Sequence, residues 1–321
     1  RAYGPGTVTL TDEDGHPTTQ TWTAAGDPDQ ARLTALVAAG QAWFYTYHGL
    51  GQLATVQAPD TLLRTWQYTN WNRLASESHP ESGTVTYTNY DNAGHLLAKT
   101  DAAGTTFQYG YDGNDRLYRI AAGAHVTTTT FEPGSDRPLT TTDGSVSTVL
   151  VYGDATGRLT RRQQAIGVYV FNTDYAYDAE DKLVSMTYPA TVGWRPKFVF
   201  SYSNGHLASI AQDGLALTPV YSLLAMDAQG RETAARYGNG ALEQRDVYDG
   251  ASARLSAIRS GAPASPAALQ NYAYEWDRVG NLLARQDLAS SPQLTERFTY
   301  DGLNRLTQAS LNGTLTLAMA Y

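Results

Sequence analysis

The sequence predicts an all-β protein: a hollow, curved or spiralling strip of antiparallel β-hairpins. Two observations support this fold class. A short motif recurs about every 21 to 28 residues, and aromatic residues occupy alternate positions before many of its copies. A short fixed period indicates one supersecondary unit copied many times. An alternation of period two places the aromatic residues on one face of a strand. The function is therefore expected to belong to the array rather than to a single cleft.

Each copy of the motif reads as an aromatic residue, an acid, a turn, a basic or polar residue, and leucine. The cleanest copies begin at Tyr90, Tyr111, Tyr177 and Tyr300. Degenerate copies begin at Tyr47, Tyr68, Tyr152, Tyr202, Tyr248 and Trp276, and weaker echoes begin at Thr11, Phe131 and Met226. Phe107, Tyr109 and Tyr111 illustrate the alternation that precedes a turn. Each unit is therefore predicted to be a hairpin with a loop of four to five residues.

The acid of each motif is predicted to accept backbone N–H groups inside its own turn. These acids are Asp91, Asp112, Asp178, Asp249, Asp277 and Asp301. Gly94, Gly157, Gly280 and Asn304 follow near the end of a turn, where a positive φ is expected. The basic residue that comes next can reach back to the acid or lie on a tyrosine ring. Six equivalent acids favour turn capping over a catalytic pair, which needs two carboxylates in different environments.

Counting the motif gives the expected size of the strip. Twelve motif starts from Tyr47 to Tyr300 predict about 24 strands, which span roughly 115 Å at ~4.8 Å per strand. Curled into one circuit, this strip has a backbone diameter of about 35 Å. Side chains fill a barrel of about eight strands but not one this wide, so a hollow wall is expected. A β-propeller is the rival fold, because two repeats match the length of one four-stranded blade.

Two segments depart from the repeat. Residues 27–40 begin with Asp and Pro, carry Leu33, Leu36 and Val37, and end with Gly40, which predicts a short helical insertion. Residues 256–271 are rich in Ala, Ser and Pro, which predicts an extended loop. The repeat otherwise continues without a linker, so residues 1–321 are expected to form a single array. Both of its ends are expected to be truncations.

Composition restricts the partners. A net charge of −8 and a pI near 5.2 argue against nucleic acid. No apolar run approaches the roughly 18 residues of a membrane helix, so membrane insertion is not expected. The sequence contains no cysteine, which excludes disulfides and thiolate metal sites. The 22 tyrosines, with many Thr, Val and Leu, are typical of strands.

The sequence predicts no catalytic, metal or cofactor-binding residue. The six histidines are scattered, and His95 and His206 occupy the basic position of the motif, while His48 occupies the acidic position. The acidic segment 12–15 resembles the start of a calcium loop but lacks the later carboxylate, so a degenerate turn is favoured. The aromatic ladders are assigned to cross-strand packing. Binding of sugar rings to them is the alternative.

Tyr-Asp followed by Gly-Arg-Leu at a spacing near 21 resembles the RHS/YD-repeat family, which includes bacterial Rhs proteins, the C-component of Tc toxins and the YD shell of teneurins. The residues that carry the resemblance are Tyr47, Tyr90, Asp91, Gly94, Tyr111, Asp112, Tyr152, Gly157, Tyr177, Asp178, Tyr202, Tyr248, Asp249, Trp276, Asp277, Gly280, Tyr300 and Asp301. The resemblance implies a hollow β-shell that encloses a C-terminal toxic domain or forms part of an adhesion ectodomain. No DPxGL-type segment precedes Tyr321, so it implies the wall without its cleavage site or cargo.

The first functional hypothesis is therefore a non-catalytic, secreted or cell-surface shell segment of the polymorphic-toxin type. Its partner is the enclosed toxin or effector domain, or the rest of the same shell. The second hypothesis is an adhesion module that binds a surface glycan or a receptor. The third is a carbohydrate-active enzyme built on a β-propeller.

Overall fold

The structure is a computed structural model that describes residues 6–24, 26–153, 156–190, 193–214 and 219–320. In these residues it contains 28 β-strands and one 3-10 helix, η1 (Pro28–Gln30). The predicted all-β class is confirmed. The chain divides into two compact units, Arg1–Phe171 and Asn172–Tyr321, where the sequence suggested a single one. The repeats run through both units, and whether they form one continuous array stays a prediction.

Unit 1 contains fifteen complete strands. They are β1 (Gly6–Thr11), β2 (Pro17–Thr23), β3 (Arg32–Ala38), β4 (Gln41–Tyr47), β5 (Leu53–Gln57), β6 (Leu63–Tyr68), β7 (Leu74–His79), β8 (Gly83–Tyr90), β9 (Leu96–Thr100), β10 (Thr106–Tyr111), β11 (Leu117–Ala122), β12 (His125–Phe131), β13 (Pro138–Asp143), β14 (Val146–Tyr152) and β15 (Leu159–Ile166). The boundary between the units falls inside β16 (Tyr169–Tyr177).

Unit 2 continues the same pattern of strands. They are β17 (Leu183–Thr187), β18 (Lys197–Ser203), β19 (His206–Gln212), β20 (Pro219–Met226), β21 (Glu232–Tyr237), β22 (Leu242–Tyr248), β23 (Leu255–Ala262), β24 (Ser265–Trp276), β25 (Leu282–Asp287), β26 (Leu294–Tyr300), β27 (Leu306–Leu311) and β28 (Thr314–Ala318).

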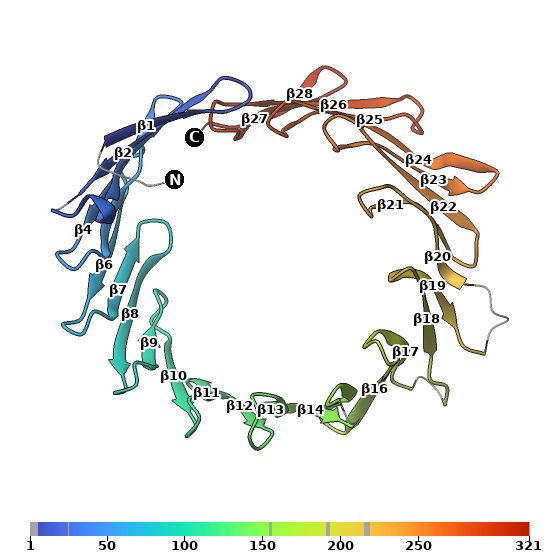
Figure 1. Ribbon diagram of the computed structural model, residues 1–321, viewed down its shortest axis with the longest axis horizontal. Helices are drawn as coiled ribbons and strands as arrows, with labels where there is room; N and C mark the ends of the chain where they lie inside the picture. Colours follow the sequence, from blue (N-terminus) through green and yellow to red (C-terminus); the bar gives the residue numbers. More distant parts are fainter. Residues whose placement is uncertain (1–5, 25, 154–155, 191–192, 215–218, 321) are drawn as a thin grey trace. The chain divides into compact units, whose positions relative to one another are not determined.

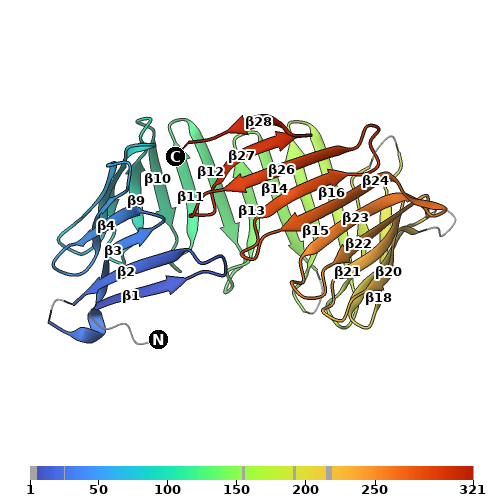
Figure 2. The same cartoon turned by 90° about the horizontal axis from the view of Figure 1, so that it is seen from above.

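Within each unit every strand pairs antiparallel with the strand that follows it in sequence, from β1 to β15 and from β16 to β28. Figures 1 and 2 show the hairpins following one another in chain order. A propeller would interrupt this pairing after every four strands. The propeller alternative, and the enzyme built on it, is therefore wrong.

The twelve motif starts account for the 24 strands β4 to β27, as the count predicted. The motif aromatic residue lies at or next to the end of an even-numbered strand, and the motif leucine lies at or near the start of the next strand. Tyr111, for example, pairs with Leu117, whereas Gly110 pairs with Arg119. Tyr118 is thus an extra residue, which makes a β-bulge beside the motif. Bulges bend a strand and increase its twist.

Each unit is a sheet one layer thick. Among the described residues, the hydrophobic side chains that are buried are all alanines, and the largest fully buried side chain is Glu243. A globular core would bury Leu, Ile, Val and Phe instead. The chain exposes 19372 Å², whereas even two separate compact domains of half its mass would expose about 16,000 Å² in total. The packing is that of a wall rather than of a filled core.

The predicted helical insertion at 27–40 is wrong. Only η1 is helical there, and Asp27 Oδ1 accepts the Asp29 N–H at 3.0 Å at its start. Half of the segment belongs to strand β3, in which Leu36 pairs with Gln20 of β2 and Trp43 of β4. β3 pairs with β2 and, from Ala35 to Ala38, with β4, and this tertiary pairing of the backbone outweighs a local helical pattern.

The predicted extended loop at 256–271 is also wrong. These residues form the facing strands β23 and β24, joined by two turn residues. The small residues that suggested a loop instead allow close packing in the sheet. A Cβ on Gly261 would lie 2.1 Å from the Ser265 carbonyl oxygen, and Ser260 is only 3% exposed. The interval of 28 residues from Tyr248 to Trp276 is therefore long because strands β23 and β24 are long.

Candidate functional site: the repeat turns

The motif acid binds the backbone of its own turn. Asp112 Oδ1 accepts the N–H groups of Asn114 at 2.9 Å and Arg116 at 3.1 Å, and its Oδ2 accepts Arg116 Nε at 2.8 Å. Asp301 repeats this arrangement with Leu303 and Arg305. One carboxylate thus satisfies two backbone donors and fixes the basic side chain that follows it.

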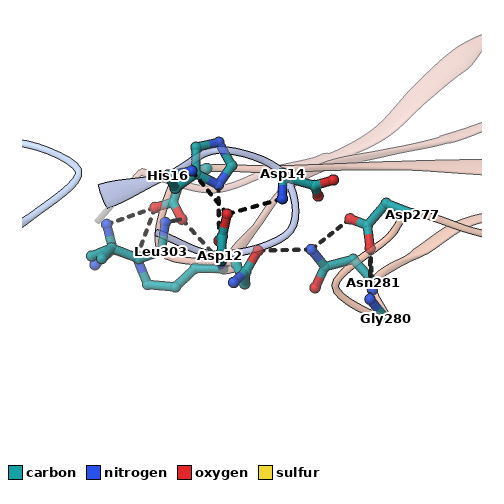
Figure 3. A network of polar contacts seen from close by, with 10 residues as sticks. Asp12, Asp14, His16, Asp277, Gly280, Asn281 and Leu303 are labelled. Atoms are coloured by element: carbon teal, nitrogen blue, oxygen red, sulfur yellow. Dashed lines mark hydrogen bonds and ion pairs between the residues drawn. The ribbon is translucent and has the colours of Figure 1, made fainter. Parts of the chain in front are cut away.

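Figure 3 shows two variants of this turn. Asp277 accepts N–H groups from Gly280 and Asn281 at 2.7 Å and the Asn281 side-chain amide at 2.7 Å. Asp12 accepts the N–H groups of Asp14 at 3.0 Å and His16 at 2.8 Å. The interpretation of segment 12–15 as a degenerate motif turn is confirmed by this backbone pattern.

The residue before the basic position adopts a positive φ, as expected for the end of the turn. The angle is 106° at Gly94, 71° at Gly157, 109° at Gly280 and 60° at Asn304. Asp115 takes the same position and conformation at 63°, so an aspartate also serves here. Asn and Asp tolerate this region better than most residues with a Cβ.

Hydrogen bonds lower the pKa values of these acids. The Arg116 guanidinium contributes most to the lowered pKa of Asp112, and the Arg231 backbone N–H contributes most for Asp227. Burial alone would raise the pKa of Asp277, but hydrogen bonds from Asn281 and Gly280 outweigh it and lower the pKa. Asp112, Asp227 and Asp277 are therefore ionised caps of their turns at neutral pH.

The motif aromatic residue bonds to the preceding repeat. The Tyr90 hydroxyl donates to the Leu74 carbonyl at 2.7 Å, and the Tyr300 hydroxyl donates to the Leu282 carbonyl at 3.0 Å. The same contact is made by Tyr47 to Leu33, Tyr152 to Pro138, Tyr202 to Leu183 and Trp276 Nε1 to Leu255. In most of these contacts the acceptor is the motif leucine, or its equivalent, one repeat earlier.

The basic residue bonds to the following repeat. Arg73 lies 5.4 Å from the centre of the Tyr90 ring, and its Nη1 donates to the Asp91 carbonyl at 2.6 Å. Arg116 over Phe131, Arg137 over Tyr152, Lys182 over Tyr202 and Arg231 over Tyr248 repeat the ring contact. We call this set of contacts, between one turn's basic residue and the next turn, a joint.

The joints show which groups the basic residue contacts, a point that the sequence left open. The basic residue both reaches back to its own acid and lies on a ring, but the ring belongs to the next repeat. Arg73, Arg116, Arg137 and Arg231 were therefore missed as contacts between repeats. Their recurrence 15 to 17 residues before the next aromatic residue was the available signal, yet spacing alone does not say which ring is closer in space. The acid of the turn after Tyr152 lies outside the described residues.

Shallow grooves separate neighbouring turns. One of about 480 Å³ lies between the turns that follow Tyr68 and Tyr90, and one of about 380 Å³ lies between the turns that follow Tyr248 and Trp276. Equivalent repeat positions line both grooves, so the grooves arise from the side-by-side arrangement of successive turns. Within the described ranges, no group of three His, Cys, Asp or Glu residues could hold a metal ion. The described residues also contain no helix long and apolar enough to cross a bilayer.

Comparison with known proteins agrees with this geometry. The RHS Repeat family matches residues 90–127 and 153–192. No curated protein matches the chain. The crystal structure of TcdB2-TccC3 is similar over 96% of this chain, with a TM-score of 0.72 and 18% identity. The structure of TcdB2-TccC3 without its hypervariable C-terminal region is similar over 94%, with a TM-score of 0.72 and 17% identity.

A third similar structure is that of TcdB2-TccC3-Cdc42, with a TM-score of 0.71 and 18% identity over 94% of this chain. The chain spans 17% of the length of that protein. The likeness at this identity is one of fold. The family model identifies RHS repeats at residues 90–127 and 153–192 of this chain.

Proposed function

We propose that the chain is a section of a shell wall that encloses a toxin or effector polypeptide and is not itself catalytic. The observation that carries this proposal is the one-layer packing of each unit. In the described residues, the buried hydrophobic side chains are all alanines, so the sheet has two accessible faces and no filled core there. Such a sheet suits a partition between an interior and a solvent. A secreted or cell-surface location follows from this role.

The turns support the proposal mechanically. Each joint links a turn to the next by a ring contact, a carbonyl contact, or both, and the tyrosine hydroxyl links it to the previous repeat. A one-layer wall needs such lateral connections, because packing between layers does not stabilise it. The similar TcdB2-TccC3 protein has a hypervariable C-terminal region, which agrees with a constant wall and a variable enclosed segment.

Protease protection in the protein at its natural length tests this function. Proteinase K should leave the enclosed polypeptide, which is not itself made of repeats, intact while the wall is folded. It should degrade that polypeptide once the wall opens in denaturant. The isolated polypeptide, at the same concentration, is the matched control. Equal digestion rates for the enclosed and the isolated polypeptide would exclude encapsulation.

One observation favours the adhesion alternative as a second candidate. Trp71 is 85% exposed beside the groove that Arg73 and Asn92 also line. An exposed indole next to polar groups suits the face of a sugar ring. In the equivalent groove between the turns of Tyr248 and Trp276, Ser252 takes the place of Trp71.

A glycan array tests this alternative. Selective binding that Trp71→Ser abolishes, with Ser252→Ala as the control, would support an adhesion module. An array without selective binding would count against it. This readout is independent of protease protection, so the two candidates can be separated.

A further inference from the structure

His95 is a titratable residue in a position that permanent cations fill in neighbouring repeats. It follows Gly94 at the end of the motif turn, where Arg73 and Arg116 stand in the repeats before and after it. Like them, it lies on the aromatic ring of the next repeat. The imidazole and the Tyr111 ring are stacked, with 4.5 Å between their centres and 20° between their planes. The joint at His95 is thus built like the others, except for its charge.

Two carboxylates flank the imidazole. Nδ1 lies 2.9 Å from Asp91 Oδ2 in its own turn, and Nε2 lies 3.9 Å from Asp115 Oδ1 in the next turn. The His95 side chain is 23% exposed, so it exchanges protons with solvent. These contacts connect two adjacent repeats through one ring.

The protonation state decides the sign of the second contact. A neutral imidazole has one N–H, and the short contact at Nδ1 uses it as a donor to Asp91. The lone pair of Nε2 then faces the Asp115 carboxylate, which is repulsive. When His95 gains a proton, the repulsion at Nε2 turns into an electrostatic attraction across 3.9 Å to the largely exposed Asp115 carboxylate of the next repeat.

The other charged and titratable groups near His95 do not cancel the change from repulsion to attraction. Arg73 reaches the same turn, but its Nη1 donates to the Asp91 carbonyl. Arg116 is paired with Asp112 at 2.7 Å. The Tyr111 hydroxyl has a pKa raised mainly by burial, so it stays neutral. The hydrogen bond from His95 contributes most to the lowered pKa of Asp91, which keeps this carboxylate ionised.

We propose that His95 makes the connection between the repeats of Tyr90 and Tyr111 pH-sensitive: the joint tightens as His95 is protonated and loosens as it becomes neutral. The neighbouring arginine joints do not titrate in this range. Acidification therefore strengthens the contact between these two adjacent hairpins of unit 1. A neutral or alkaline medium favours local opening at the same place.

Unit 2 contains a natural control. His206 also follows a residue with positive φ, Gly205, in the basic position of its motif. Its turn has Ser203 where the His95 turn has Asp91, and the next motif starts with Met226 instead of a tyrosine. Across the described part of the chain, its imidazole forms no ion pair or aromatic stack. Its joint should not respond to pH.

Hydrogen exchange measured by mass spectrometry, at pH 5.5 and pH 8, tests the proposal on the whole chain. After correction for the intrinsic pH dependence of exchange, protection of residues 91–96 and 111–116 should fall about tenfold between pH 5.5 and pH 8. Residues 203–207 and 226–231 should change less than twofold. His95→Arg should keep the high protection at both pH values, and His95→Gln should show low protection at both.

The variants separate His95 from other histidines. His79, which also lies near two carboxylates, Glu77 and Glu81, is unchanged in His95→Arg, so any response that it causes persists in that variant. Far-UV circular dichroism shows that each variant is folded. Protection at 91–96 and 111–116 that is equal at both pH values in the native chain, or a full pH response in His95→Arg, would overturn the proposal.

Discussion

In each unit, the two edges of the sheet differ in how strictly they repeat. On the motif edge, even-numbered strands turn into odd-numbered strands, and five residues separate Tyr90 from Leu96 and Tyr111 from Leu117. On the plain edge, odd-numbered strands turn into even-numbered strands. There two residues separate Ala122 from His125, whereas nine separate Thr187 from Lys197. The variation in the repeat period thus arises largely on the plain edge and in strand length.

This difference shows where neighbouring repeats depend on each other. A motif turn must place its acid, its positive φ, its basic side chain and its aromatic residue against the turns on either side. Its length is therefore constrained. A plain turn does not need this full set of contacts, although it can have an acid cap, as at Asp101, or a largely exposed ion pair, as between His125 and Asp143. Substitutions on the two edges should consequently differ in cost.

Gly157→Val should have the largest effect and is best compared with Gly144→Val on the plain edge. Both glycines have a positive φ, 71° and 57°, so both variants incur a backbone cost of about 1–2 kcal/mol or more. A Cβ on Gly157 would also displace Arg137, whereas one on Gly144 would meet open space. Gly157→Val should therefore lower the thermal melting temperature clearly more than Gly144→Val does. Equal melting temperatures would remove the distinction between the edges.

Arg116→Ala should destabilise unit 1 by about 2–3 kcal/mol, because it removes charged hydrogen bonds to Asp112 and the ring contact with Phe131. His125→Ala, which removes an exposed ion pair on the plain edge, should cost at most about 1 kcal/mol. Urea unfolding followed by circular dichroism measures both. If His125→Ala cost as much as Arg116→Ala, the joints would not stabilise the wall.

Tyr90→Phe should cost about 1 kcal/mol, since it leaves the Leu74 carbonyl without its hydroxyl donor but keeps the ring under Arg73. Tyr169→Phe is the control, because Tyr169 is 68% exposed on the plain edge and should leave the unfolding midpoint unchanged. A Tyr90→Phe variant as stable as the native chain would show that the ring alone connects the repeats.

Acidification should give the smallest effect. The pKa of Asp112 is lowered from its usual 3.8, chiefly by the Arg116 hydrogen bond. The unfolded chain takes up the proton at the usual pKa, so this stabilisation is complete above about pH 4 and is lost as the pH falls through the lower folded-state value. Melting temperatures should fall below pH 4, and Asp112→Asn should flatten that dependence more than Asp101→Asn on the plain edge.

Much of the fold could be predicted because the relevant information is local. The twelve motif starts gave the 24 strands from β4 to β27, and the positive φ at Gly94 and Gly280 followed from turn chemistry. The segments 27–40 and 256–271 were predicted incorrectly for one physical reason. Their local composition favours helix or loop, but partners on both sides, such as Gln20 and Trp43 for Leu36, make each a strand.

The sequence by itself determined the hairpin unit, its number and the capping role of its acids, because alternation, turn residues and period act within one repeat. Only the tertiary structure decided which ring each cation contacts, as with Arg116 over Phe131, and that His95 lies between Asp91 and Asp115. These contacts join residues of different hairpins, and their partners depend on the stagger and bulges of the strands. Periodicity does not encode that stagger, so the connections between repeats emerge only in three dimensions.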